Sequence, residues 1–259
     1  MKPRLSFSER IQKIIDTLRP NRYALRPYLI RDGKSHPFAV ICPGGAYRKV
    51  CSYVEGLPFA RQLNARGYHA IVVYYRVREK AKYPAPQEDV KRALREILSR
   101  SEEWLLEKEG WSLWGASAGG HLAASLMCEP GDFPRPSALI LIYPVVTMGE
   151  KTHRETRRNL LGDDPDPAMF SRLSVERHVS GDFPSTFLWY GTADSSVDPE
   201  NSLMLRRALD EAGVPCELIA YEGVGHGAGL GEGTEAEGWI GEAVRFWENH
   251  RKLQGKEDE

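Results

Sequence analysis

The sequence has little net charge and no long apolar run. Its 259 residues include 35 basic and 36 acidic side chains, which gives a formal net charge of −1 at pH 7. Nucleic-acid-binding proteins usually carry a basic excess or a basic stripe, so this balance argues against a nucleic-acid partner. No segment stays apolar over the ~20 residues that a membrane-spanning helix needs, and the N-terminal residues lack the apolar stretch of a secretion signal. We expect no membrane association and a cytoplasmic location.

Cysteine is scarce, and its spacing suits neither a metal site nor a disulfide framework. We interpret the four cysteines as reduced thiols of a cytoplasmic protein: Cys42, Cys51, Cys128 and Cys216. The sequence also lacks a His, Asp and Glu set with metal-ligand spacing, and it lacks the Gly-Lys-Ser/Thr ending of a phosphate-binding loop. We therefore expect neither a metal ion nor an organic cofactor.

What the sequence does have is an alternation of short apolar runs and amphipathic segments. After an early strand or hairpin arm at 23–31, β-branched and aromatic runs predict buried strands at 38–42, 69–75, 111–114, 138–143, 186–190 and 216–221. Helical spacing predicts helices at 6–19, 56–66, 87–100, 118–128, 199–212 and 235–250. This alternation favours a mostly parallel sheet with helices on both faces, within a single α/β domain over residues 1–259.

One segment interrupts the alternation. Residues 145–182 are long, polar and proline-bearing, and they separate two predicted core strands. Long connections of this kind are often functional. We expect this segment to form either a partial cap over the functional site or an excursion of loop and helix.

The pentapeptide Gly115-Ala116-Ser117-Ala118-Gly119 lies between a predicted strand and a predicted helix. A sharp strand-to-helix turn lifts a serine hydroxyl off the sheet, beside a base and backbone donors, and so makes it a useful nucleophile. Glycines two residues to either side let the chain pass close to itself. The context indicates a nucleophile elbow with Ser117 as the nucleophile.

A candidate acid and a candidate base also follow strands. Asp194 comes after the run at 186–190, and His226 comes after the run at 216–221. Ligands bind at the carboxyl ends of parallel strands, so we expect Ser117, Asp194 and His226 to meet there as a catalytic triad. Asp198 is a second candidate acid. We favour Asp194 because it directly follows the strand, whereas Asp198 precedes a proline and suits a helix N-cap.

An oxyanion would need backbone donors. The N–H of Ala118 opens a helix, where free donors and the helix dipole favour negative charge. Gly45 and Ala46 follow another strand and supply the second set of donors. We also consider Glu55, which follows this loop, as a hydrogen-bonding support for it.

Three further side chains have open roles. Tyr47 and Trp189 are candidate substrate contacts that could stack on a sugar or aryl ring, although a core position suits Trp189 equally well. His121 lies four residues after Ser117 on the predicted helix, and we interpret it as a packed helix residue rather than a catalytic base.

These motifs together resemble the α/β-hydrolase serine carboxylesterases that include acetylxylan-esterase-like and feruloyl-esterase-like enzymes. The matching segments are Pro43-Gly44-Gly45-Ala46-Tyr47, Tyr75-Arg76, Trp114 to Ala123, Tyr143-Pro144, Gly191 to Asp194, and His226-Gly227. The resemblance covers roughly 38–250. It implies cofactor-free hydrolysis of short acyl esters, often acetyl groups on sugars. Ala46 stands where a third glycine is common, and Asp198 stands where a proline often follows the valine.

Two alternatives to the esterase stay open from the sequence. An arylformamidase or a small peptidase-like hydrolase would use the same triad. A non-catalytic protein on the same fold would bind a ligand without turnover, although candidates for all three triad roles argue against it. The sequence predicts a small-molecule ester as the partner, and it leaves the acyl length, the alcohol and the oligomeric state open.

Overall fold

The computed structural model describes residues 10–11, 14, 21–129 and 131–257. Most of the helix predicted over 6–19 therefore lies outside the described residues. The described residues form one seven-stranded sheet in the order β1-β3-β2-β4-β5-β6-β7. Its strands are β1 Ala24–Tyr28, β2 Phe38–Cys42, β3 His69–Tyr74, β4 Ser112–Ala116, β5 Ala138–Ile142, β6 Thr186–Gly191 and β7 Cys216–Tyr221. Only β1 runs antiparallel to its neighbour; the other pairings are parallel.

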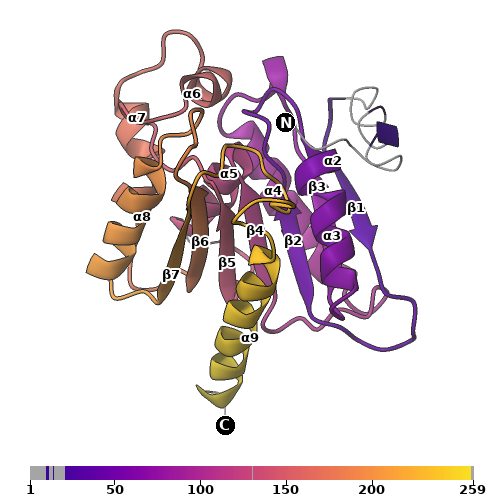
Figure 1. Cartoon of the computed structure of the whole chain (residues 1–259). Helices are drawn as coiled ribbons and strands as arrows, with labels where there is room; N and C mark the ends of the chain where they lie inside the picture. The colour runs from indigo at the N-terminus through magenta and orange to yellow at the C-terminus, as the bar shows by residue number, and fades with distance from the viewer. Residues whose placement is uncertain (1–9, 12–13, 15–20, 130, 258–259) are drawn as a thin grey trace.

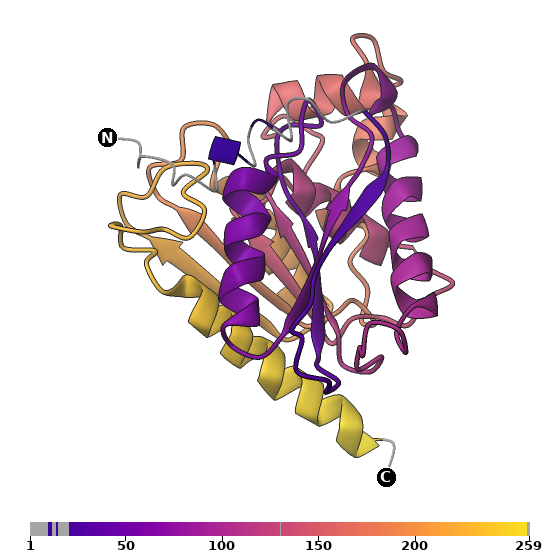
Figure 2. The same cartoon turned by 90° about the vertical axis from the view of Figure 1, so that its right-hand side faces the viewer.

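Helices cover both faces of the sheet (Figures 1 and 2). Helices α3 (Leu57–Asn64) and α9 (Trp239–Glu257) lie on one face, and α4 (Ala85–Ser99) and α5 (Ala118–Met127) lie on the other. Other helices of the residues from 21 onward that the structure describes are α2 Ser52–Glu55, α6 Arg154–Leu161, α7 Ala168–Arg172 and α8 Glu200–Glu211, with short 3₁₀ helices η1 Arg78–Lys80 and η2 Val175–Arg177. This arrangement confirms the predicted architecture of a mostly parallel sheet between two helical layers.

The burial of the central strands explains why their positions could be predicted from the sequence. Strands β2 to β5 are buried at every position because helices cover both of their faces, and such strands read as continuous apolar runs. The edge strands β1 and β7 are only partly buried. The last helix begins at Trp239 rather than at the predicted residue 235, because the preceding residues form turns through Gly231, Gly233 and Gly238, all with positive φ.

Residues 145–182 form an excursion that contains α6, α7 and η2, beyond the carboxyl-end edge of the sheet (Figure 1). The side-chain amide of Asn159 on α6 donates to the Ala46 carbonyl at 2.7 Å. Glu155, on the same helix, forms an ion pair with Arg48 at 3.1 Å. The excursion therefore contacts the loop after β2. Its role as a partial cap stays a prediction, as does the single-domain organisation.

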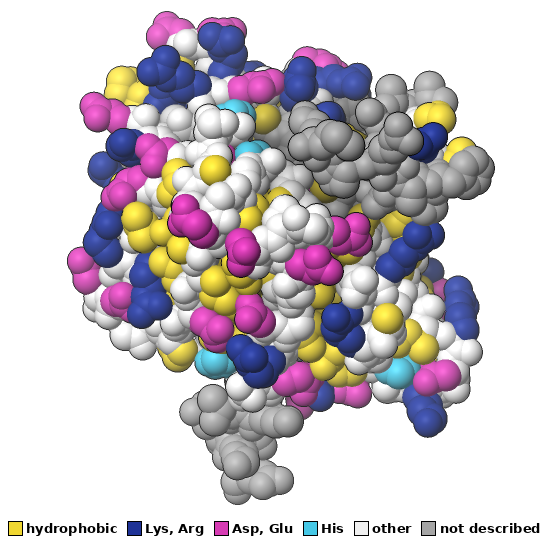
Figure 3. Space-filling view, in the orientation of Figure 1, with side chains coloured by type: hydrophobic (Ala, Val, Ile, Leu, Met, Phe, Trp, Pro, Cys, Tyr) yellow, Lys and Arg dark blue, Asp and Glu magenta, His cyan; other side chains and the backbone are white. Residues whose placement is uncertain are grey.

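The surface carries both signs of charge. On the face shown in Figure 3, acidic and basic side chains are interspersed among the described residues. None of the described helices has both the length and the apolar composition needed to cross a membrane. Within the described ranges, no group of three or more His, Cys, Asp or Glu side chains could hold a metal ion.

Candidate active site

Ser117 occupies the turn between β4 and α5. Its backbone has φ 53° and ψ −122°, a region that residues other than glycine seldom adopt and that carries local strain. The turn is anchored on the end of β5, since the Ser117 N–H donates to the Ile142 carbonyl at 2.9 Å and its carbonyl accepts from the Val145 N–H at 3.0 Å. The geometry is that of the predicted nucleophile elbow.

Two glycines of the elbow are required by close backbone approach. A Cβ on Gly115 would overlap the Gly119 carbonyl, and a Cβ on Gly119 would overlap the Cys42 carbonyl at the end of β2. At both positions the added Cβ would meet backbone atoms, so the overlap could not be relieved by a change of side-chain rotamer. These glycines therefore let α5 begin directly against the central strands and lift Ser117 above them.

The structure brings the three predicted triad residues together in a hydrogen-bonded chain. Ser117 Oγ lies 2.9 Å from His226 Nε2, and His226 Nδ1 lies 2.7 Å from Asp194 Oδ2. The other carboxylate oxygen, Asp194 Oδ1, accepts from the N–H groups of Ser196 and Val197, each at 2.9 Å. The Asp194 side chain is 2% exposed. Because this carboxylate accepts hydrogen bonds at both oxygens, Nδ1 of His226 carries the proton, and Nε2 is left to accept one from Ser117.

Asp198, the second candidate acid, points elsewhere. Its carboxylate pairs with Lys151 at 3.0 Å and accepts from the Glu200 N–H at 3.0 Å, at the start of α8. These two contacts, the backbone hydrogen bond first, lower the pKa of Asp198. The choice between the two acids is therefore made by geometry: Asp194 is the one that contacts His226.

The loop after β2 lies against the nucleophile. A Cβ on Gly44 would come 2.8 Å from Ser117 Cβ, so the loop and the serine are in contact at this point. The Gly44 N–H already donates to Glu55 Oε2 at 2.7 Å. The following N–H groups, of Gly45 and Ala46, donate no hydrogen bond to another described residue. Ala118, as the first residue of α5, also has an N–H without an intrahelical acceptor. Donors from both predicted segments thus border Ser117.

Buried side chains hold this loop in place. Tyr75 donates from its hydroxyl to the Pro43 carbonyl, and Tyr47 donates from its hydroxyl to His121 Nδ1 at 2.9 Å. The contact between Glu55 and Gly44 agrees with the support of the loop that the sequence suggests. Asn159 is a further support that the sequence does not indicate, because a contact across 113 positions leaves no local signal.

The structure corrects the predicted substrate contact at Tyr47, and for Trp189 it supports the core position over the substrate contact. Both residues are 0% exposed. Tyr47 has φ 55° and turns its side chain inward to His121, while Trp189 packs among Tyr143, Tyr221 and Trp239. Neither side chain has a surface that a substrate could contact, so both are structural.

His121 is a packed helix residue, as interpreted from the sequence. It is 0% exposed, and its Nε2 donates to the Leu173 carbonyl at 2.8 Å while Nδ1 accepts from Tyr47. Burial lowers its pKa to about 4. His121 is therefore neutral and fully occupied, and it is not available to Ser117.

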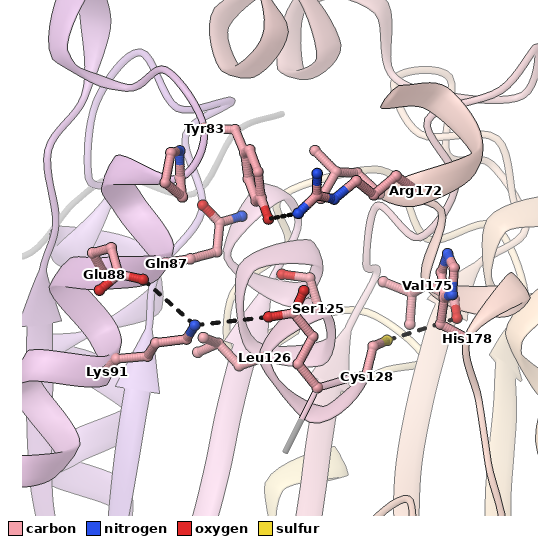
Figure 4. Close-up of a pocket in the computed structure, with 13 residues that line it drawn as sticks. Tyr83, Gln87, Glu88, Lys91, Ser125, Leu126, Cys128, Arg172, Val175 and His178 are labelled. Carbon is pink, nitrogen blue, oxygen red and sulfur yellow. Dashed lines mark hydrogen bonds and ion pairs between the residues drawn. The ribbon is translucent and has the colours of Figure 1, made fainter. Parts of the chain in front are cut away.

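A separate pocket lies between α4, α5 and α7 (Figure 4). Its volume is about 130 Å³, and Tyr83, Gln87, Lys91 and Arg172 are among the residues that line it. Arg172 lies beside the Tyr83 hydroxyl at 3.5 Å. None of the lining residues belongs to the triad or to the two donor segments, so this pocket is distinct from the site around Ser117.

Comparison with known proteins gives consistent matches. A family model of the alpha/beta hydrolase fold matches residues 57–230. The crystal structure of the acetyl ester-xyloside bifunctional hydrolase from Caldicellulosiruptor lactoaceticus has a TM-score of 0.81 and 34% sequence identity to this chain, over 90% of each chain. A sugar hydrolase from Lactococcus lactis has a TM-score of 0.79 and 27% identity, over 90% of this chain and 96% of that one.

Two curated relatives are longer proteins. The chain is 31% identical over 236 residues to endo-1,4-beta-xylanase B of Butyrivibrio fibrisolvens, which is 86% of this chain and 36% of the relative. It is 28% identical over 194 residues to the acetylxylan esterase of Xylanibacter ruminicola, which is 73% of this chain and 40% of the relative. The chain thus spans less than half the length of these two relatives. Because the family model matches more than half of the chain, and the sheet and its helices agree with that match, the protein belongs to the α/β-hydrolase fold family.

Proposed function

We propose that the protein is a serine-dependent carboxylic ester hydrolase that removes short acyl groups, acetyl first of all, from sugars such as xylo-oligosaccharides. The observation that carries this proposal is the hydrogen-bonded chain from Ser117 through His226 to Asp194. These three hydrogen-bonded side chains lie beside two segments with backbone N–H donors, Gly45–Ala46 and Ala118. That combination suits acyl transfer through a covalent intermediate.

In the proposed first half-reaction, Ser117 Oγ attacks the acyl carbon while His226 Nε2 takes the hydroxyl proton. Asp194 stabilises the resulting imidazolium through Nδ1. The negative charge that develops on the acyl oxygen is stabilised by the N–H groups of Gly45, Ala46 and Ala118. His226 then gives its proton to the leaving alcohol as the ester bond breaks, and the acyl group remains on Ser117.

In the second half-reaction, water takes the place of the alcohol. His226 accepts a proton from the water as its oxygen attacks the acyl-enzyme, and it returns that proton to Ser117 Oγ as the acid leaves. The two steps consume one ester and one water and release one alcohol and one carboxylic acid. The nucleophile, the base, the acid and the oxyanion donors of both steps are groups of this chain.

The sugar ester as substrate class rests on the relatives. An acetylxylan esterase and an acetyl ester-xyloside hydrolase are both similar to this chain. The polar character of the excursion at residues 145–182 suits a hydroxyl-rich alcohol moiety. Through Asn159 the excursion contacts the loop at residues 43–47, the donor loop.

The proposal is tested with acetylated xylo-oligosaccharides, p-nitrophenyl acetate and N-formylkynurenine as parallel substrates. The wild-type protein should release acetate from the first two, and Ser117→Ala should lower both rates by about 10³-fold or more. A preference for N-formylkynurenine would point to an arylformamidase instead. A Ser117→Ala variant that keeps most of its activity would exclude the serine mechanism.

A further inference from the structure

Glu55 is a carboxylate buried beneath the donor loop. It ends the short helix α2 and is 4% exposed. Among the described residues, no Lys, Arg or His side chain lies within ion-pair distance of it. A buried carboxylate with no cation in direct contact has a high desolvation cost. Burial raises the pKa of Glu55, against the smaller opposing effects of its hydrogen bonds and of the nearby His226 and Lys49. The contacts of Glu55 should therefore explain why a carboxylate is buried at this position.

The contacts of Glu55 identify it as a hydrogen-bond acceptor at both oxygens. Oε2 accepts from the Gly44 N–H at 2.7 Å, and Oε1 lies 2.9 Å from the Tyr143 hydroxyl. The same hydroxyl lies 3.2 Å from the N–H of Gly229. A backbone N–H can only donate, so the Tyr143 oxygen accepts from Gly229, and its single proton is free to go to Glu55. Glu55 therefore fits the network in its ionised form.

This network joins the two loops that flank the nucleophile. Gly44 belongs to the loop after β2 and touches Ser117, as shown by the 2.8 Å approach of a Cβ placed on it to Ser117 Cβ. Gly229 lies three residues after His226, in the loop after β7. The Tyr143 ring also packs edge-on against the His226 imidazole, with ring centroids 4.9 Å apart. One carboxylate and one phenol thus connect the donor side and the base side of the site.

We propose that Glu55, acting through Gly44 and Tyr143, is a positioning residue that fixes the donor loop and the His226 loop relative to Ser117. This inference rests on the proposed function. By accepting the hydrogen bond of the Gly44 N–H, Glu55 sets the peptide orientations that leave the next N–H groups available to an oxyanion. By holding Tyr143 and Gly229, it limits where the His226 ring can lie.

The proposal requires a carboxylate at residue 55. A glutamine of the same size would present its NH₂ group either to the Gly44 N–H or to the Tyr143 O–H, and two donors would then face each other. Removing the Tyr143 hydroxyl relieves this conflict, because the introduced glutamine can turn its oxygen to Gly44 and its NH₂ toward the phenyl ring. The effects of Glu55→Gln and Tyr143→Phe should therefore be non-additive.

The experiment compares Glu55→Gln, Tyr143→Phe and the double variant with wild type, using p-nitrophenyl acetate and phenylboronic acid, which forms a tetrahedral adduct with a nucleophilic serine. Glu55→Gln should lower kcat by about 10- to 100-fold with KM within about threefold, because misplaced donors and base weaken chiefly the transition state. The Ki of phenylboronic acid should rise by the same factor as kcat/KM falls. The double variant should lose less activity than the product of the two single losses.

A matched control uses a second Tyr–Glu pair that is remote from Ser117. Tyr68, in the turn between α3 and β3, donates to Glu248 on α9 at 2.9 Å, so Glu248→Gln and Tyr68→Phe make the same chemical changes elsewhere. These controls should alter thermal stability while kcat and the boronate Ki stay at wild-type values. Should Glu55→Gln fail to fold, Tyr143→Phe against Tyr68→Phe carries the test with the same readouts.

Two results would overturn the proposal. One is a folded Glu55→Gln variant, or Tyr143→Phe in its place, with kcat and boronate Ki within about twofold of wild type. The other is a loss of activity that follows only the loss of folded protein, as judged by titration of active sites with a fluorophosphonate. Failure of the proposed function looks different: without the serine mechanism, wild-type Ser117 would not react with the fluorophosphonate at all, and with another substrate class, Ser117 would react but acetate esters would not be hydrolysed.

Discussion

The two sides of Ser117 are built differently. On the donor side, the loop at 43–47 is held by buried groups: Glu55 on Gly44, Tyr75 on Pro43, and His121 on Tyr47. On the base side, His226 lies in a glycine-rich loop after an edge strand that is only partly buried, and its side chain is 21% exposed. Its hydrogen-bonded partner is the buried Asp194 carboxylate, and the Tyr143 ring packs against it.

The difference follows from what each side must do. Backbone donors stabilise an oxyanion only if they are in place before the charge forms, so a rigid, buried setting suits them. The imidazole must accept and return a proton within one turnover and must exchange an alcohol for a water beside it. A partly exposed ring, fixed in tautomer by one carboxylate, suits that task. The backbone donors are therefore fixed by buried side chains, whereas the His226 ring stays accessible to the alcohol and to water.

The largest expected effect comes from removing the one charge that orients the base. Asp194→Asn should lower kcat by roughly 10³-fold or more, because an amide favours the wrong imidazole tautomer. Asp198→Asn, which alters the Lys151 pair instead, should keep kcat within about threefold. Steady-state kinetics of both variants on p-nitrophenyl acetate checks this, and equal losses would contradict the assignment of Asp194.

A second prediction compares a glycine from each side. Gly45 has φ 124°, and a Cβ there would overlap the Lys49 carbonyl, so Gly45→Ala must displace the donor loop. Because displacement of about 1 Å can cost about 10²-fold in rate, we expect kcat to fall by about 10- to 100-fold.

The matched change on the base side is Gly227→Ala. Gly227 has φ 73° and open space around its Cβ position, so the substitution costs only about 1 kcal/mol of backbone strain. Activity should stay within about threefold of wild type. The test is to measure kcat and urea unfolding for both glycine variants. A larger loss of kcat in Gly227→Ala than in Gly45→Ala would contradict the difference between the two sides.

The burial of the donor side also predicts a pH dependence of stability. His121 has a pKa of about 4 in the folded protein, against an ordinary value of 6.5, because burial disfavours its charged form. Between pH 6.5 and 4, His121 binds a proton in the unfolded chain but stays neutral in the folded protein. Stability is therefore lost as the pH falls from 6.5 to 4, by up to about 3 kcal/mol from this residue.

The test is urea unfolding of wild type and His121→Gln at several pH values between 7 and 4. The variant should be less stable at pH 7 yet show a shallower decline toward pH 4. His178→Gln, at an exposed histidine, serves as the control and should keep the wild-type slope. An unchanged slope in His121→Gln would contradict a neutral, buried His121.

The sequence predicts best what local chemistry determines. The strands β2 to β6 read as apolar runs, and the elbow around Ser117 needs glycines at fixed offsets from the serine. The triad order follows from polar residues at strand ends. By contrast, the sequence misplaced Tyr47 and left Trp189 open between a substrate contact and the core, because the exposure of an aromatic ring depends on which elements pack over it. Trp189 lies in a strand covered on both faces, and Tyr47 turns inward through a positive φ.

The same limit explains the supporting residues. Glu55 contacts Tyr143 across 88 positions, and Asn159 contacts Ala46 across 113. No periodicity or spacing in the chain encodes such contacts, which arise only when the strands close into one sheet. The cytoplasmic location stays a prediction from the sequence, because no contact within the fold depends on it.

The most direct measurement is peptide mapping by mass spectrometry after the wild-type protein reacts with a fluorophosphonate. A hydrogen-bonded Ser117–His226–Asp194 chain predicts one adduct per chain, on Ser117, with the reaction slowed at least about 10²-fold in His226→Ala. Labelling at another residue, or none while ester hydrolysis continues, would contradict it.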